Sequence, residues 1–312
     1  MNRRARGIRI SQWLPALLAA VILLSGCAGS APRAFPESAP AAELSGVPFY
    51  PQEENHCGPA ALATVLGAHD AAVAPDELAD WLYLPAREGS LQVEMVAEVR
   101  QQGLPGWAVT DEPERVMHEI RAGRPVLVLK NLGLSWWPLW HYAVVIGYRP
   151  EDDVVLLRSG TEPERELSQS RFMRFWGRSD YWALVIAPPG DVPAALDAPE
   201  YLQGVANLES VAGADSDLED AWLAGIRRWP NDSAFWLAYA NHQLAREQPE
   251  EAESILQAGL QHAQEHGALH HNLAWLLAEQ GRRKEALVQA QAAVVAGGEF
   301  LERSLALLES LE

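Results

Sequence analysis

Cys57, Gln52 and His141 are the residues whose types could together carry out nucleophilic chemistry. Gly58 and Pro59 follow Cys57, and this order predicts that a helix begins at the thiol, because proline is tolerated in a first helical turn. The N-terminus of a helix stabilises a thiolate, so we expect a thiol pKa below its ordinary value. The alternative is a cysteine buried as a small core hydrophobe. The polar residues directly before Cys57 favour a reactive thiol.

A nucleophilic thiol needs a base and a donor for the developing oxyanion. Gln52 lies five residues before Cys57, and its side-chain amide can donate to that oxyanion. His141 opens the strongest predicted strand, and a histidine there is rigidly aimed, as a base must be. The alternative is an ordinary half-buried strand histidine. The other histidines lie beside the thiol, in or after helices, or in the C-terminal part: His56, His69, His118, His242, His262, His266, His270 and His271.

A tryptophan-rich loop directly precedes His141. It contains Trp136, Trp137 and Trp140 around a proline. This composition favours a partly exposed aromatic surface, which could form one wall of a substrate cleft. The alternative is packing of the loop against neighbouring helices.

The first 26 residues have the features of a secretory signal. Four arginines precede an apolar stretch at about 13–24, which is shorter than the ~20 residues needed to span a bilayer. The stretch ends in Leu24-Ser25-Gly26-Cys27, which resembles a bacterial lipobox. The resemblance implies cleavage before Cys27 and diacylation of its sulfur. The alternative is an uncleaved N-terminal anchor.

The lipobox resemblance also implies a location. In the resembled lipoproteins, a residue other than aspartate after the lipidated cysteine favours the outer membrane, and Ala28 stands there. We therefore expect attachment to the periplasmic face of the outer membrane of a Gram-negative host. The chain has two cysteines, so an acylated Cys27 would leave Cys57 without an intrachain disulfide partner.

The charge of the chain excludes several classes of partner. Without the signal, 20 basic and 42 acidic residues remain, a net charge of −22. This balance argues against nucleic acid and against electrostatic binding to anionic lipid, so membrane contact is expected through the acyl chains on Cys27. No phosphate-cradling glycine loop and no cysteine–histidine cluster with metal-ligand spacing is found, so we expect no cofactor and no metal.

Composition and periodicity divide the chain into five segments. They are the signal at 1–26, a flexible lipidated tether rich in Ala, Pro and Ser at 27–44, a first domain at 45–188, a Pro-rich linker at 189–200 and a helical domain at 201–312.

The first domain has helical patterns before strand patterns. Helices are predicted at 57–66, 75–82, 90–102 and 112–122, and strands at 126–129, 141–148, 154–157 and 181–186. Residues 149–153 read as a hairpin connection between two of the strands. This order predicts an α+β domain with a mostly antiparallel sheet.

The helical domain repeats with a period of 34 residues. Small residues recur at this spacing: Ala206, Ala240 and Ala274, then Ala224, Ala258 and Ala292. A 34-residue period with small residues at helix-packing positions is typical of tetratricopeptide repeats. Two repeats are clear, and the one at about 201–232 is degenerate. The alternative is a generic helical bundle. Such repeats stack and present a concave face, which predicts a protein partner for this domain.

The cysteine and histidine motifs together resemble a known family. The segments Gln52…Asn55-His56-Cys57-Gly58-Pro59-Ala60-Ala61-Leu62 and His141-Tyr-Ala-Val-Val-Ile-Gly-Tyr148 are similar to the bacteriocin-processing, double-glycine-leader type of papain-like cysteine peptidase. The resemblance covers about 46–188. It implies a papain-like fold with Cys57 as nucleophile, His141 as base and Gln52 as oxyanion donor. It also implies a resting thiolate–imidazolium pair that attacks a peptide carbonyl.

One position departs from the resembled family. That family has an aspartate at the end of the strand after the histidine strand, where this chain has Arg158, Ser159 and Gly160. Ser159 could accept a hydrogen bond from the imidazole. Asp152, Asp153 or Glu162 could substitute if the register differs, although the two aspartates have the features of turn residues.

The sequence thus predicts a membrane-anchored cysteine peptidase that cleaves a peptide or protein substrate, with the repeats recruiting a partner or the substrate. Two alternatives stay open. The first is a non-catalytic periplasmic scaffold with a degenerate peptidase domain. The second is acyl or peptidyl transfer on the same fold, in which an amine replaces water as acceptor.

Overall fold

The computed structural model describes residues 39–52, 56–213, 217–264 and 266–312. Cys27 and the expected signal lie outside the described residues, as does most of the expected tether. None of the helices in the described part of the chain has both the length and the apolar character needed to cross a membrane.

An antiparallel sheet of seven strands forms the centre of the N-terminal part. Its strand order is β2-β7-β3-β4-β5-β6, and β1 pairs separately with β4. The strands are β1 (Ala42–Glu43), β2 (Gly106–Val109), β3 (Val126–Asn131), β4 (Trp140–Arg149), β5 (Val154–Ser159), β6 (Glu162–Ser168) and β7 (Ala183–Ile186).

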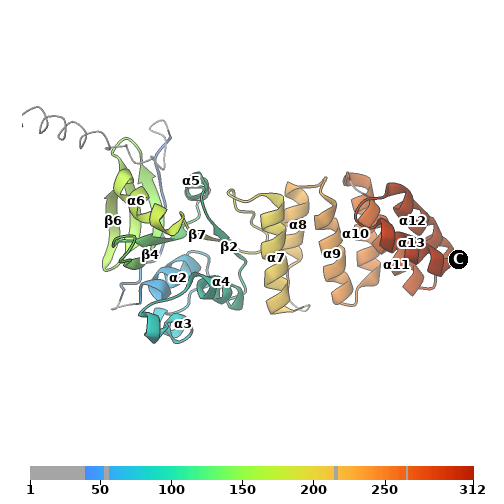
Figure 1. Cartoon of the computed structure of the whole chain (residues 1–312), viewed down its shortest axis with the longest axis horizontal. Coiled ribbons are helices and arrows are strands. Elements are labelled where there is room, and N and C mark those ends of the chain that lie inside the picture. Colours follow the sequence, from blue (N-terminus) through green and yellow to red (C-terminus); the bar gives the residue numbers. More distant parts are fainter. Residues whose placement is uncertain (1–38, 53–55, 214–216, 265) are drawn as a thin grey trace, which may run out of the picture.

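Helices cover both faces of this sheet (Figure 1). On one face lie α2 (Cys57–Gly67), α3 (Pro75–Leu82) and α4 (Gln92–Gln101), and on the other lie α5 (Glu114–Arg121) and α6 (Gln169–Trp176). Two short 3₁₀ turns, η2 (Pro85–Arg87) and η3 (Gly177–Ser179), connect these elements.

The strands supply both cores by alternation. In β3, Val126 and Val128 join the core under α5 and α6, whereas Leu127 and Leu129 join the core under α2 and α4. Successive side chains of a strand point to opposite faces, so an uninterrupted apolar run suits a strand that is covered on both sides. The register therefore decides which side of the sheet each polar residue of the site faces.

The predicted antiparallel sheet is confirmed for this part of the chain, but its order is less strict than expected, because β1 and β2 precede α5 and α6 lies between β6 and β7. Three strands and one helix were not predicted: β1, β2, β6 and α6. β6 contains the sequence Glu-Pro-Glu-Arg-Glu, which lacks the apolar residues that a strand prediction relies on. Such a charged sequence is suited to the exposed edge of a sheet, where β6 lies. β1 lies inside the segment expected as tether, and its two residues pair with Tyr148 and Gly147 of β4.

The C-terminal part consists of consecutive helices that pack as neighbours (Figure 1). They are α7 (Ala198–Ala212), α8 (Glu219–Arg228), α9 (Ser233–Ala245), α10 (Pro249–His262), α11 (Gly267–Glu279), α12 (Arg283–Ala296) and α13 (Leu301–Leu311). Ala240 and Ala274, which recur with the period, and Ala252 and Ala286, which also lie 34 residues apart, are fully buried between helices. The region is helical as expected, and its assignment to tetratricopeptide repeats stays a prediction.

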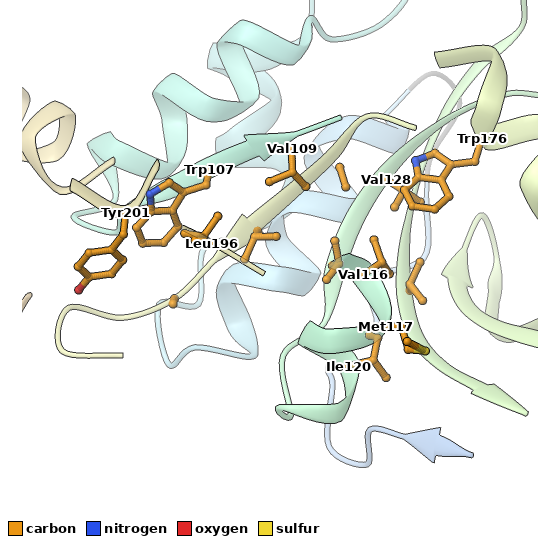
Figure 2. Packing of buried hydrophobic residues seen from close by; sticks show 14 of the residues in the cluster. Trp107, Val109, Val116, Met117, Ile120, Val128, Trp176, Leu196 and Tyr201 are labelled. Atoms are coloured by element: carbon orange, nitrogen blue, oxygen red, sulfur yellow. The ribbon is translucent and has the colours of Figure 1, made fainter. Parts of the chain in front are cut away.

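The first helix of this region packs directly on the sheet domain. The ring of Trp107 in β2 stacks on Tyr201 of α7 at 5.6 Å between centroids, and its Nε1–H donates to the carbonyl of Glu200 at 3.0 Å. Gly204 makes this approach possible, because a Cβ there would lie 1.8 Å from Nε1 of Trp107. Figure 2 shows Trp107 and Tyr201 at one end of a cluster that continues to Trp176.

Polar contacts also attach the segment at 189–200, which was expected to be a linker, to the sheet domain. Arg124 binds Asp191 at 2.8 Å, and the carboxylate of Glu119 accepts a hydrogen bond from the backbone N–H of Ala195 at 2.6 Å. Asp197 caps α7, which begins inside the segment expected as linker. The sheet domain and the helices α7, α8 and α9 therefore share one continuous hydrophobic core.

Candidate active site

Cys57 is the first residue of α2, as the Gly-Pro sequence after it predicted. The helix lies on the sheet with nearly all of its length buried, and the thiol at its N-terminus is half-buried and free. Gly58 allows α2 to approach the start of α4, since a Cβ there would lie 2.5 Å from the Ser90 hydroxyl. His56 is turned to Tyr83, with ring centroids 5.0 Å apart, so its ring is engaged outside the site.

Gln52, Cys57 and Ser159 line one cavity between α2 and the ends of β4 and β5. The backbone N–H of Gln52 donates to the carbonyl of Gly160 at 3.0 Å and so ties the segment before the helix to the end of β5. Tyr142 closes the other side of the cavity. The space measures about 10 Å³, which is room for about one water molecule.

His141 lies at the start of β4, one residue before Tyr142, and it is not among the residues that line the cavity. Its Nε2 is 2.9 Å from the hydroxyl oxygen of Ser159, which is 4% exposed at the end of β5. The serine hydroxyl thus meets the ring from the strand position where the resembled family has an aspartate. Because Nε2 is engaged, Nδ1 is the ring nitrogen left for a second partner.

The other acidic candidates for orienting His141 lie elsewhere. The Asp152 carboxylate is 3.9 Å from Nε of Arg149, and Asp153 has a positive φ of 56° in the β4–β5 turn. Glu162 is on β6, 3.7 Å from an Arg165 guanidinium nitrogen. Among the described residues, Ser159 is the side chain that hydrogen-bonds the ring of His141.

Burial dominates the electrostatics of Cys57. It raises the thiol pKa above the ordinary value, and the backbone N–H groups of Tyr142, Gly58 and Cys57 itself offset this only in part. The charge of Lys130 also lowers the pKa, by the smallest contribution. The expected lowering of the thiol pKa by the helix N-terminus is therefore wrong in its net direction, because the loss of hydration outweighs the helix.

Burial also makes the imidazole of His141 hard to protonate. It lowers the pKa of His141 to about 3, with further contributions from the positive charges of Lys130 and Arg165. The expected resting thiolate–imidazolium pair is wrong for the structure described. At neutral pH the site holds a neutral thiol and a neutral imidazole.

Lys130 is the residue of this site that sequence reasoning missed. It is the direct cross-strand partner of His141 in the β3–β4 ladder, and it is only 1% exposed. Burial and the charge of Arg165 lower its pKa to about 7. One signal was visible in the sequence: an ionisable residue ends the otherwise apolar run from Val126 to Leu129.

The tryptophan loop before His141 is exposed, as predicted. Trp136 and Trp137 are 78% and 73% exposed, although the loop itself is held firmly. The side-chain oxygen of Asn131 accepts hydrogen bonds from the backbone N–H groups of Gly133 and Leu139, both at 2.9 Å. Arg178 adds hydrogen bonds to the carbonyls of Asn131 and Gly133. A fixed apolar rim therefore directly precedes His141.

Three solved structures are similar to the N-terminal part. The first, a C39-like peptidase from Bacillus anthracis, is 16% identical with a TM-score of 0.41, over 48% of this chain and 98% of its own. The second, a double-glycine-motif protease from an AMS/PCAT transporter in complex with its leader peptide, is 19% identical with a TM-score of 0.38, over 48% and 99%. The third, the peptidase domain of Streptococcus ComA, is 20% identical with a TM-score of 0.38, over 46% and 98%.

No curated protein matches the chain. A family model matches just under half of it, in the part that contains strands β2 to β6, α2 and the residues of the cavity. Residues 44–181 are similar to the Peptidase_C39 like family, and this match supports a cysteine peptidase-type fold for that part of the chain.

Proposed function

We propose that the domain at 45–188 is a thiol peptidase that hydrolyses peptide bonds, with Cys57 as nucleophile and His141 as base. Gln52 donates to the oxyanion, and Ser159 orients the base. The observation that carries the proposal is the joint placement of these groups. Cys57, Gln52 and Ser159 line one cavity, and Ser159 is 2.9 Å from the ring of His141.

The neutral state of the site determines how the reaction begins. If Nε2–H of His141 donates to Ser159, the ring presents an unprotonated Nδ1, which is the form that can accept a proton. On attack, the proton of the Cys57 sulfur moves to Nδ1, and the sulfur bonds to the substrate carbonyl carbon. The imidazolium then gives that proton to the leaving amine as the C–N bond breaks. Water then attacks the carbonyl carbon of the thioester and gives a proton to Nδ1 of His141. The C–S bond breaks, the proton returns to the Cys57 sulfur, and the carboxylic acid product leaves.

The oxyanion would form near the N-terminus of α2. The backbone N–H of Cys57 and the side-chain amide of Gln52 are the donors available there, and such donors act strongly in a site with little water. Ser159 can fix the tautomer of His141 but cannot neutralise an imidazolium as a carboxylate does. We therefore propose slower turnover than an otherwise equal site with an aspartate.

The proposal extends to the location and partners of the chain. Cys27 would carry the acyl anchor at the periplasmic face of the outer membrane, and the helical domain at 201–312 would recruit a partner or the substrate. Substitution Cys27→Ser tests the anchor. The chain should move from the membrane fraction to the soluble fraction, and retention in the membrane would contradict lipid anchoring through this residue.

Peptide cleavage tests the catalytic proposal. The purified chain is incubated with a peptide library, and cleavage is followed by mass spectrometry. Cys57→Ala should abolish cleavage, and His141→Ala should reduce it at least a hundredfold. His118→Ala, at an exposed position of α5, is the matched control and should change nothing. Cleavage that survives Cys57→Ala, or equal rates in the two histidine variants, would refute the proposal.

A non-catalytic scaffold is the second candidate, and two observations favour it. Ser159 stands in the place of the acid, and the cavity has room for about one water molecule. A host strain that lacks the protein distinguishes the candidates. Full complementation by the Cys57→Ala chain supports the scaffold, whereas failure of that chain at normal abundance supports the peptidase.

A further inference from the structure

The tryptophan loop at 132–140 gathers exposed apolar side chains on one short stretch of the surface. Of the 12 large apolar residues that are exposed in the described part of the chain, five lie in this loop: Leu134, Trp136, Trp137, Leu139 and Trp140. Single exposed apolar residues are ordinary on a protein surface, but a contiguous group of large ones marks a contact surface. The proposed reaction uses none of these side chains.

The composition of the loop restricts the chemistry of its partner. Its sequence, Leu-Gly-Leu-Ser-Trp-Trp-Pro-Leu-Trp, contains no charged residue, in a chain with a large excess of acidic residues. Tryptophan has an apolar ring with one polar N–H, and it is enriched where a bilayer meets water. Contact with such an interface requires apolar side chains and no positive charge, so the acidic balance of the chain does not oppose it.

The backbone of the loop is closed on itself. The N–H of Leu132 donates to the carbonyl of Leu139 at 2.9 Å, and Leu134 and Trp137 exchange two backbone hydrogen bonds at 3.0 and 3.1 Å. Gly133 permits this closure, because a Cβ there would lie 2.4 Å from the carbonyl oxygen of Trp137. Unpaired backbone groups are costly away from water, so a loop that pairs its own groups is suited to enter a lipid surface.

The proposed lipid anchor brings the loop within reach of a membrane. β1 pairs with Tyr148, so the described chain enters the sheet at the end of β4 that is remote from Trp140. Eight positions of strand separate these two residues, a distance of ~27 Å. The 12 residues from Ala28 to Ala39 can span at most ~43 Å. An acylated Cys27 and the loop can therefore contact the same lipid surface.

We propose that the tryptophan loop inserts into the interface of a lipid bilayer and gives the chain a second membrane contact beside the acyl chains on Cys27. The inference rests on the proposed anchor, because attachment through Cys27 makes insertion of the loop an intramolecular step, for which a weak contact suffices. His141 directly follows the loop, so insertion also holds the proposed peptidase site close to the lipid surface.

Fluorescence quenching by brominated lipid tests whether the loop touches acyl chains. The full chain, isolated with its anchor, is reconstituted in vesicles of phosphatidylcholine that include phosphatidylcholine brominated near the ester end of its acyl chains. Part of the tryptophan emission should be quenched. Trp136→Phe/Trp137→Phe should lose a large part of this quenching. Trp81→Phe, at a position of α3 that is 72% exposed, is the matched control and should keep it.

A second variant changes insertion without removing an indole. Leu134→Asp places a charge in the loop and leaves Trp136, Trp137 and Trp140 in place. A charge opposes entry into the bilayer, so we expect the quenching to fall by about threefold or more. Leu305→Asp, on α13, is the matched control, because the two leucines are 49% and 48% exposed. Circular dichroism verifies that each variant is folded.

Three outcomes would overturn the inference. If the chain floats with the vesicles but the loop variants leave the quenching unchanged, the loop does not insert and the anchor stands. If the chain does not float with the vesicles, loop insertion and the anchor fail together. If Leu134→Asp leaves the quenching unchanged but lowers cleavage of soluble peptides, the loop binds an apolar peptide instead. The quenching does not involve Cys57, so failure of the proposed catalysis would leave it intact.

Discussion

Ser159 lies with its hydroxyl oxygen 2.9 Å from Nε2 of His141, at the strand end where the resembled peptidases have an aspartate. A hydroxyl can hold the ring in one orientation and one tautomer, as an aspartate does. It contributes no negative charge, so an imidazolium at position 141 would gain less stabilisation than beside a carboxylate. Orientation and charge compensation, which one residue provides in an aspartate triad, are separated in this site.

Substitution of Ser159 should separate the two effects. Ser159→Ala removes one neutral hydrogen bond, and we expect kcat/KM to fall about fivefold, in line with ~1 kcal/mol for such a bond. Ser159→Asp restores the carboxylate and should raise the pKa of His141 and increase kcat. Steady-state kinetics and NMR titration give the two quantities. Equal kcat/KM in wild type and Ser159→Ala would show that the contact has no part in catalysis.

Gln52 should act on the transition state and not on the thiol. Gln52→Ala should lower kcat by a factor of about 10²–10³, because an oxyanion donor is lost. Alkylation of Cys57 by iodoacetamide forms no oxyanion, so its rate should stay within about twofold of wild type. If both rates fall together, Gln52 instead shapes the entrance or the fold of the cavity.

The pH at which kcat/KM falls on the acid side of the pH–rate profile should be unusually low. The base is lost only when His141 is protonated, and its pKa is about 3, so kcat/KM should persist far below pH 6.5. The same lowered pKa means that the unfolded chain binds an extra proton between about pH 6.5 and 3, so folding stability declines over this window as pH falls. Circular dichroism at each pH separates loss of fold from loss of base. An acid limb near pH 6.5 in folded protein would contradict the neutral, buried imidazole.

The junction between the sheet domain and α7 should be intolerant of any side chain at position 204. Gly204→Val would drive a Cβ into the indole of Trp107, and we expect the free energy of unfolding to fall by about 1–3 kcal/mol. Gln203→Val, at the exposed neighbouring position of the same helix, is the matched control and should stay within about 0.5 kcal/mol. Thermal or urea unfolding measures both. Equal stabilities would show that the contact of Trp107 with α7 does not hold the two parts together.

The sequence was sufficient to find the residues whose positions depend on local patterns. A helix that begins at Cys57 follows from the Gly-Pro pair, and the strand that opens at His141 follows from an uninterrupted run of β-branched and aromatic residues. The hairpin between β4 and β5 follows from its Pro and Asp residues. Each of these patterns acts over a few neighbouring residues, so it can be read without the fold.

Elements that are stabilised by partners far away in the sequence were not predicted. β6 carries alternating charges and becomes a strand because β5 pairs with it, and β2 has four residues that pair with β7 more than 70 positions later. The contact of Trp107 with Tyr201 joins parts that the sequence separates by an apparent linker. Pairing and packing between distant segments decided these features, and no local propensity encodes them.

The groups that can do chemistry can be read from the residues alone: a thiol at a helix N-terminus, a strand histidine, a glutamine amide and a serine where an acid was expected. Their protonation depends on packing between segments that are far apart in the chain. The register that sets Lys130 opposite His141, and the depth at which Cys57 is buried, come from the packing of α2 and the pairing of β3 with β4. Desolvation depends on every atom that surrounds a group, so it reversed the thiol pKa expected from the helix alone.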